Sequence, residues 1–160
     1  MKIGIVMGSS SDWNVMKGAV DILNSFGVEN EVKVLSAHRT PHQLEEWVKD
    51  LRQRGFAAVI AGAGGAAHLA GVVAAFTTLP VIGVPVKGNA FEGLDSLLSM
   101  VQMPSGIPVA VVAVNGAKNA ALLAVEIMAV TDAALKDKMD EFRTKQAEKV
   151  IESNESLKSE

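Results

Sequence analysis

Short apolar segments alternate along this chain with longer segments of helical spacing, and this alternation constrains the fold more than any other feature. Five short segments are predicted as strands: residues 2–7, 31–35, 57–61, 80–84 and 109–114. We interpret them as continuously apolar, which indicates burial on both faces of a sheet. Helices of about ten residues between such strands make right-handed crossovers between parallel strands. The sequence therefore predicts an α/β protein, a three-layer α/β/α domain doubly wound around a parallel sheet.

The segments between the predicted strands carry helix signals. Two of them end at Gly27 and Gly55, and glycine is the preferred residue just beyond the end of a helix. The predicted helices of this part of the chain are residues 12–26, 43–54, about 66–76, and 94–101.

Two further helices are predicted at the end of the chain. Residues 117–130 are apolar on nearly every side, which exceeds what one contact with a sheet requires. Residues 136 to about 155 are charged, with sparse apolar side chains. We expect one domain over 1–160, with an α/β core of about 1–131 and a C-terminal helix of about 132–157. The pair suggests subunit contact, with the last helix reaching a neighbouring subunit; a solvated terminal helix is the alternative.

Composition excludes several classes of function. The chain has no cysteine, so disulfides, thiolate metal sites and a cysteine nucleophile are absent. A net charge of −3, 4% aromatic residues and no tyrosine argue against a nucleic-acid partner. The first ten residues do not resemble a signal peptide, and glycines and prolines interrupt the apolar stretch 57–86. We therefore expect a cytoplasmic protein without a membrane partner.

Ligands of doubly wound sheets bind beyond the carboxyl ends of the strands. The segment GSSSD, residues 8–12, follows the first predicted strand. Its glycine, backbone N–H groups and the hydroxyls of Ser9 and Ser11 suit a phosphate, whereas Asp12 suits ribose hydroxyls. Simple helix capping, with Ser10, Ser11 or Asp12 as the N-cap, is the alternative.

The segment SAHRTPHQ, residues 36–43, divides into two parts. Its second half is a predicted capping box, T-x-x-Q, with Pro41 at the first helical position and His42 exposed on the first turn. Because Pro41 marks the helix start, His38 lies outside the helix. A zinc site made by His38 and His42 is therefore disfavoured.

That account leaves Ser36, His38 and Arg39 without a structural role. A histidine that titrates near neutrality suits proton transfer at the carboxyl edge of a sheet. Arg39 beside it suits a phosphate or a carboxylate. We interpret these three residues as a candidate catalytic site.

Residues 62–67, GAGGAA, formally match the dinucleotide-binding pattern after the third predicted strand. That pattern also requires an acidic residue about 20 positions further on, and this region has none. We reject NAD binding and expect a turn whose backbone approaches a flat ligand closely. His68 follows the turn, and it is either a polar residue at a helix start or a catalytic group.

Taken together, GSSSD, SAHRTP, AGAGGAAHL and DSLLSMVQMPSGIPVAVVAV resemble one family. It is the class I N5-carboxyaminoimidazole ribonucleotide mutases of purine biosynthesis, the catalytic subunit of phosphoribosylaminoimidazole carboxylase. The resemblance covers residues 1 to about 142. It implies a flavodoxin-like fold and a homo-octamer whose sites neighbouring subunits complete. It also implies no metal or other cofactor, and a carboxyaminoimidazole ribonucleotide synthetase as functional partner.

The resemblance also implies roles for individual residues. His38 matches the general acid and base, a proton shuttle during decarboxylation and recarboxylation of the substrate. The positions expected to bind the nucleotide substrate or surround its carboxylate are Ser9, Ser11, Asp12, Ser36, Arg39, Gly64, His68 and Leu69. One departure is Ala70-Gly71-Val72, where the family usually has Pro-Gly-Met. The alternatives are a carboxylase that uses free CO2 and a non-catalytic, nucleotide-binding flavodoxin-like module.

Overall fold

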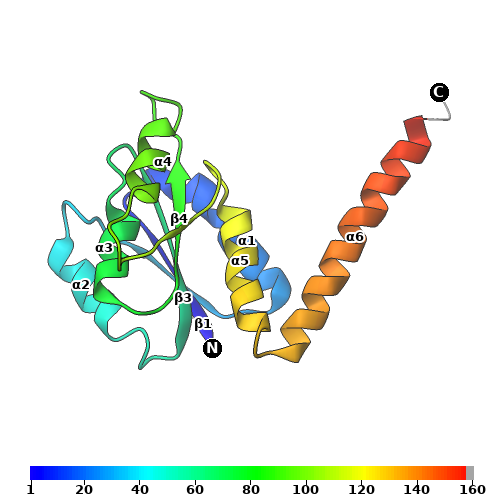
Figure 1. Cartoon of the computed structure of the whole chain (residues 1–160), viewed down its shortest axis with the longest axis horizontal. Helices are drawn as coiled ribbons and strands as arrows, with labels where there is room; N and C mark the ends of the chain where they lie inside the picture. Colours follow the sequence, from blue (N-terminus) through cyan, green and yellow to red (C-terminus); the bar gives the residue numbers. More distant parts are fainter. Residues whose placement is uncertain (158–160) are drawn as a thin grey trace. The chain divides into compact units, whose positions relative to one another are not determined.

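The computed structural model describes residues 1–157, and its centre is a five-stranded parallel sheet (Figure 1). The strand order is β2-β1-β3-β4-β5, so the chain winds outward from β1 in both directions, as in flavodoxin-like proteins. The strands are β1 (Lys2–Met7), β2 (Asn30–Val34), β3 (Phe56–Gly64), β4 (Val81–Val86) and β5 (Ala110–Val111). The predicted doubly wound parallel sheet is confirmed.

Helices cover both faces of this sheet. In Figure 1, α2 and α3 lie on one side, and α1 and α5 lie on the other. The helical elements are the 3₁₀ turn η1 (Ser10–Asp12), α1 (Trp13–Phe26), α2 (Pro41–Lys49), α3 (Leu69–Phe76), α4 (Leu94–Val101), α5 (Ala117–Ala129) and α6 (Ala133–Leu157). The predicted three-layer α/β/α arrangement is therefore confirmed.

A glycine ends the first helical segment as predicted, but the predicted helix end at Gly55 is wrong. Gly27 directly follows α1 with φ of 73°, and its N–H bonds back to the carbonyls of the last helical turn. Gly55 has φ of 81°, but α2 already ends at Lys49, and residues 50–55 form turns rather than helix. Both glycines occupy the left-handed region, which other residues adopt only with strain.

Burial on both faces holds for the central strands but not for the edges. The side chains of Ile3, Ile5 and Ile60 are fully buried, and all of β4 is buried. Val34 on β2 is 53% exposed, and β5 contains only two residues, neither of them buried. The predicted double burial is wrong for β2 and β5 because each has a neighbouring strand on one side only.

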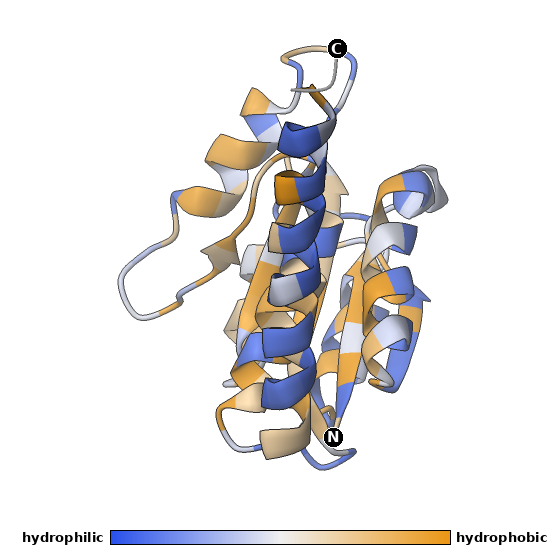
Figure 2. Cartoon of the chain, turned by 90° about the vertical axis from the view of Figure 1, so that its right-hand side faces the viewer, coloured by the Kyte–Doolittle hydropathy of each residue, from blue (hydrophilic) through white to orange (hydrophobic). Residues whose placement is uncertain are grey.

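The chain divides into two compact units, Met1–Ala124 and a second that begins at Val125. In the second unit, the Arg143 guanidinium contacts the Glu126 carboxylate at 2.6 Å, and Leu135 and Met139 are buried. Figure 2 shows mainly hydrophilic residues along α6. Within residues 1–157, no helix combines the length and the apolar character needed to cross a membrane. The prediction that α6 reaches a neighbouring subunit stays a prediction.

Candidate active site

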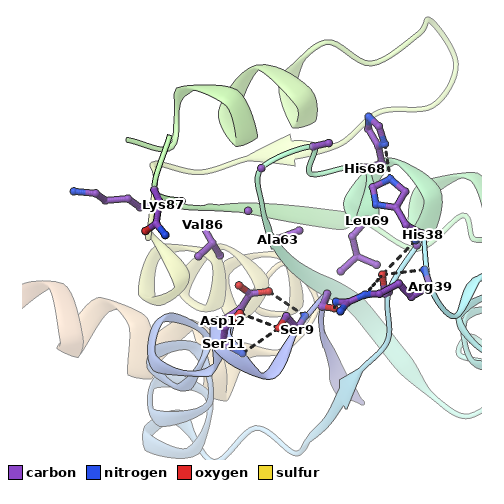
Figure 3. Close-up of a pocket in the computed structure, with 18 residues that line it drawn as sticks. Ser9, Ser11, Asp12, His38, Arg39, Ala63, His68, Leu69, Val86 and Lys87 are labelled. Carbon is purple, nitrogen blue, oxygen red and sulfur yellow. Dashed lines mark hydrogen bonds between the residues drawn. The ribbon is translucent and has the colours of Figure 1, made fainter. Parts of the chain in front are cut away.

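A cavity of 590 Å³ opens at the carboxyl edge of the sheet, where residues that follow β1 to β4 come together (Figure 3). Segments 36–39 and 86–89 line it together with parts of 8–12 and 63–69. All the residues that the sequence suggested for a site line this one cavity: Ser9, Ser11, Asp12, Ser36, His38, Arg39, Gly64, His68 and Leu69. Their roles in binding and catalysis stay predictions.

The serines after β1 form a tight turn that carries Asp12. The Ser9 hydroxyl oxygen accepts from the Ser11 N–H at 3.3 Å and from the Ser11 hydroxyl at 2.8 Å. The Asp12 carboxylate accepts from the Ser9 N–H at 3.1 Å. Ser9 is thus the N-cap of η1, in place of the predicted Ser10 or Ser11; Asp12 is the N-cap of α1 but makes no side-chain cap hydrogen bond.

Asp12 is a buried carboxyl group, only 8% exposed. Burial raises the pKa of Asp12 above its ordinary value of 3.8, although hydrogen bonds from Ser9 and Ser11 and the charge of Arg39 partly oppose this effect. Because the cavity wall disfavours the bare charge, hydroxyl donors from a bound ligand would stabilise the carboxylate.

We expect Asp12→Asn to make the protein more stable near neutral pH while it weakens substrate binding. The folded state holds the Asp12 proton more tightly than the unfolded state, so this group's contribution to stability falls as pH rises above about 4. Asparagine lacks this ionisation and keeps an oxygen for the Ser9 N–H. Urea unfolding of both proteins between pH 4 and 8 measures the difference. If the wild type became more stable relative to Asp12→Asn as the pH rises, the raised pKa assigned to Asp12 would be contradicted.

The loop after β2 is organised around the Ser36 hydroxyl. This oxygen accepts from the backbone N–H groups of His38 at 3.3 Å and Arg39 at 3.2 Å. The Arg39 guanidinium donates to the Gly8 carbonyl at 2.8 Å, which ties this loop to the end of β1. Its Nε lies 3.4 Å from the Ser36 hydroxyl. The guanidinium is therefore anchored beside the GSSSD turn, and a positive charge beside hydroxyl and N–H groups is a combination that suits an anion.

The predicted capping box at Thr40 is not formed. Thr40 precedes α2, and Pro41 occupies its first turn as predicted, but the Thr40 side chain makes no cap hydrogen bond. Its hydroxyl instead accepts from the Ser36 N–H at 2.8 Å and donates to the Ser36 carbonyl at 3.2 Å. Thr40 thus holds the loop that carries His38, because its one side-chain oxygen serves Ser36 instead of the helix end.

His38 and His68 form a hydrogen-bonded pair. His38 Nε2 lies 2.8 Å from His68 Nδ1, and the two rings are nearly perpendicular, at 85°, with centroids 5.0 Å apart. The two residues are 30 positions apart in the sequence, and they reach each other from loops that follow β2 and β3. His42 is exposed on α2, as expected, and does not line the cavity.

Small residues at the end of β3 and directly after it form an apolar wall of the cavity. Ala63, Gly64, Gly65 and Ala66 line it together with Leu69, which is 2% exposed. Gly65 has φ of 63°, and a side chain there would be strained. The departure at residues 70–72 lies in α3, and none of the three lines the cavity. The loop can therefore pack closely against a flat ligand.

Two polar residues of the cavity lining, Lys87 and Asn89, were given no role from the sequence. Lys87 and Asn89 follow β4, and Lys87 forms an ion pair with Glu92. In Figure 3 the Lys87 side chain extends away from the other labelled residues. The position of Lys87 and Asn89 directly after the fourth predicted strand could have identified them, because every loop at this edge of the sheet is a candidate for ligand binding.

The donor set does not resemble a metal centre. Within residues 1–157, no three histidine, aspartate or glutamate side chains are grouped as metal ligands. The hydrogen-bond donors around the GSSSD turn and the loop after β2 include hydroxyls, backbone N–H groups and a guanidinium, which suit a phosphorylated sugar.

The fold and the cavity together define a class: flavodoxin-like α/β proteins with a small-molecule site at the carboxyl edge of the sheet, where the winding direction changes. Within that class the sequence comparison is specific. The family model described as AIR carboxylase matches residues 2–149, and this chain belongs to that family.

Relatives and solved structures agree with this assignment. The N5-carboxyaminoimidazole ribonucleotide mutase of Pyrococcus abyssi is 58% identical over 142 residues, 89% of this chain and 82% of that protein. The protein of the same name from Vibrio vulnificus is 55% identical over 94% of this chain and 95% of its own length. The crystal structure of Treponema denticola PurE superposes with a TM-score of 0.87 at 32% identity, covering 97% of both chains.

Proposed function

We propose that this chain is an isomerase that converts N5-carboxyaminoimidazole ribonucleotide into 4-carboxy-5-aminoimidazole ribonucleotide in purine biosynthesis. The observation that carries the proposal is that four kinds of functional group line the same cavity. An anchored guanidinium, a serine-rich turn, a buried carboxyl group and a histidine pair meet beside an apolar wall. This is the set that a phosphorylated ribose with a labile carboxylate requires.

The proposed binding mode pairs each part of the ligand with protein groups of complementary charge or hydrogen-bonding character. Arg39, with the hydroxyls of Ser9, Ser11 and Ser36, holds the phosphate, because the Gly8 carbonyl fixes the guanidinium beside them. Asp12 accepts from the ribose hydroxyls. Both sugar and phosphate are then held at the β1 side of the cavity, which leaves the base near His38.

The chemistry needs one proton carrier. The bond between the exocyclic nitrogen and the carboxylate carbon breaks, CO2 is released, and the nitrogen gains a proton. Ring carbon 4 then attacks CO2, and its hydrogen leaves as a proton. His38 gives the first proton and takes the second, so the enzyme returns to its starting state with no net consumption.

CO2 must stay in place between these two steps. Gly64, His68 and Leu69 lie around the position proposed for the carboxylate. The small apolar residues 63–66 leave space for CO2 beside them, and their apolar surface excludes water from that space. His38 and Arg39 are nevertheless exposed in the single chain. This supports closure of the site by a neighbouring subunit.

We propose that this neighbour belongs to a homo-octamer, the assembly that the family resemblance implies. Leu94, Leu98 and Val101 are between 49% and 55% exposed, and their spacing places them along one face of α4. Phe91, which precedes this helix, is 68% exposed. Light scattering should give eight times the chain mass of 16.8 kDa. Leu98→Glu should lower the assembly state, whereas Glu46→Lys, at an exposed position on α2, should not. A stable monomer at micromolar concentration would overturn the proposal.

Assays with two substrates separate the enzyme alternatives. Purified protein should convert the N5-carboxylated nucleotide without added bicarbonate. Equal turnover of aminoimidazole ribonucleotide with bicarbonate alone would instead establish the carboxylase that uses free CO2. A yellow protein with flavin absorbance and no turnover would establish the flavodoxin-like module. We also propose that the protein is cytoplasmic. Its proposed functional partner is a synthetase that supplies the substrate by carboxylating the exocyclic nitrogen of aminoimidazole ribonucleotide.

A further inference from the structure

Two polar side chains are buried within residues 1–157, and only one of them takes part in the proposed chemistry. Asp12 lies in the wall of the cavity, whereas Ser96, on α4, is fully buried and does not line the cavity. A serine on the buried face of a helix is less favourable than alanine unless its hydroxyl has a hydrogen-bond partner. The role of Ser96 therefore depends on the groups that its hydroxyl contacts.

The Ser96 hydroxyl joins α4 to the end of β4. It donates to the Val86 carbonyl at 3.0 Å and to the Gly93 carbonyl at 2.9 Å. Gly93 directly precedes α4, so the contact with Gly93 is local to the first turn of the helix. Val86 is the last residue of β4 and lies ten positions before Ser96 in the sequence. One side chain thus holds the helix and the strand end together.

This strand end packs against the part of the cavity proposed to retain CO2. Gly64 is the neighbour of Val86 in the sheet, and a Cβ atom on Gly64 would lie 3.1 Å from the Val86 carbonyl oxygen. Both residues line the cavity, and Figure 3 shows Val86 on β4 beside Ala63 on β3. The carbonyl that accepts from Ser96 is therefore also the group that the Gly64 backbone approaches closely.

We propose, on the basis of the function proposed above, that Ser96 is a positioning residue for the retention of CO2. By holding the Val86 carbonyl, its hydroxyl keeps the end of β4 against Gly64 and sets the width of this part of the cavity. When the bond between the exocyclic nitrogen and the carboxylate carbon breaks, the nitrogen takes a proton from His38 and CO2 has two fates. Ring carbon 4 attacks it, or it leaves the site.

Escape of CO2 has a product of its own. The enzyme then releases aminoimidazole ribonucleotide, and His38 regains its proton from water. A narrow, apolar site favours attack by ring carbon 4, because CO2 stays beside the ring and water is excluded. Loss of the hydrogen bond from Ser96 frees the end of β4 to move away from Gly64, so the fraction of CO2 that escapes should rise.

The fate of a labelled carboxylate measures this role in a single turnover. Substrate with carbon-14 in its carboxylate is mixed with excess enzyme, and the label is counted in the product and in released CO2, after subtraction of carbamate decay without enzyme. Ser96→Ala should raise the released fraction roughly fivefold above that of the wild type, since one hydrogen bond is lost. A partly unfolded sample does not alter this ratio, because it is taken per turnover. An unchanged ratio would overturn the proposal.

Ser99→Ala is the matched control. Ser99 also lies on α4, but its hydroxyl donates to the Asp95 carbonyl at 2.7 Å, within the same helix. Its loss should leave the released fraction unchanged, and an equal rise in both variants would overturn the specific role of Ser96. If Ser96→Ala does not fold, Ser96→Cys takes its place. A thiol is a weaker donor on a side chain of similar shape, so the released fraction should again rise, by a smaller factor.

Hydrogen exchange followed by mass spectrometry tests the positioning without any substrate. Residues 84–90 should exchange faster in Ser96→Ala than in the wild type or in Ser99→Ala, because the end of β4 has lost its hydrogen bond to α4. Equal exchange in all three proteins would overturn the positioning role. A wild-type protein that does not convert the substrate would refute the proposed function, and the exchange rates would still decide whether Ser96 holds the end of β4.

Discussion

Replacement of His38 by asparagine should lower kcat by roughly 10²- to 10⁴-fold, because His38 is the group proposed to both give and take the proton. Asparagine retains hydrogen-bonding capacity in a similar volume, and the exposed position of His38 makes loss of the fold unexpected. Substrate affinity should stay close to that of the wild type. Single-turnover kinetics and calorimetric titration with the product measure the two quantities separately.

His42→Asn is the matched control for this experiment. It removes a histidine four positions away, on the exposed face of the first turn of α2, outside the cavity. Its kinetic constants should equal those of the wild type. If His38→Asn kept more than a tenth of the activity, another proton carrier would be required and the proposed mechanism would fail.

Replacement of Arg39 by alanine should act mainly on binding. The guanidinium is held by the Gly8 carbonyl and lies beside the serine turn, so its loss removes a charge-assisted contact with the phosphate. We expect KM to rise by roughly 100-fold, with a smaller change in kcat. Arg39→Lys should restore only part of the affinity, since an ammonium group cannot make the same planar set of contacts.

Arg52→Ala provides the matched control for Arg39. Arg52 also donates from its guanidinium, to the carbonyl and the hydroxyl of Thr78, but it lies in a different hollow of the surface. Its loss should leave KM unchanged. An equal rise in KM in both variants would mean that the effect reflects loss of net positive charge and not phosphate binding.

The parts of the fold that local chemistry decides were predictable. Pro41 fits the first turn of a helix because its missing N–H and fixed φ cost nothing there. Gly27 and Gly55 adopt the left-handed conformation that glycine tolerates. Thr40 shows the limit, because its hydroxyl bonds to Ser36 and not to the end of α2, although either partner is local in the sequence. Pattern alone could not rank these two choices.

The extent of the outer strands was not predictable from apolar content. Residues 109–114 read as a buried strand, yet β5 forms only over Ala110–Val111. A segment's exposure depends on which strands lie beside it, and a sequence pattern does not state that order. The same reason explains β2, which lies at the other edge of the sheet.

By itself, the sequence determined the alternation of strands and helices, the polar turns at the carboxyl ends of the strands, and most of the polar residues that line the cavity. The tertiary structure alone decided the pairing of His38 with His68. Their loops follow β2 and β3, which do not pair with each other, since β1 lies between them. A contact across 30 residues depends on this strand order and on the direction of two loops, and neither is encoded in any local segment.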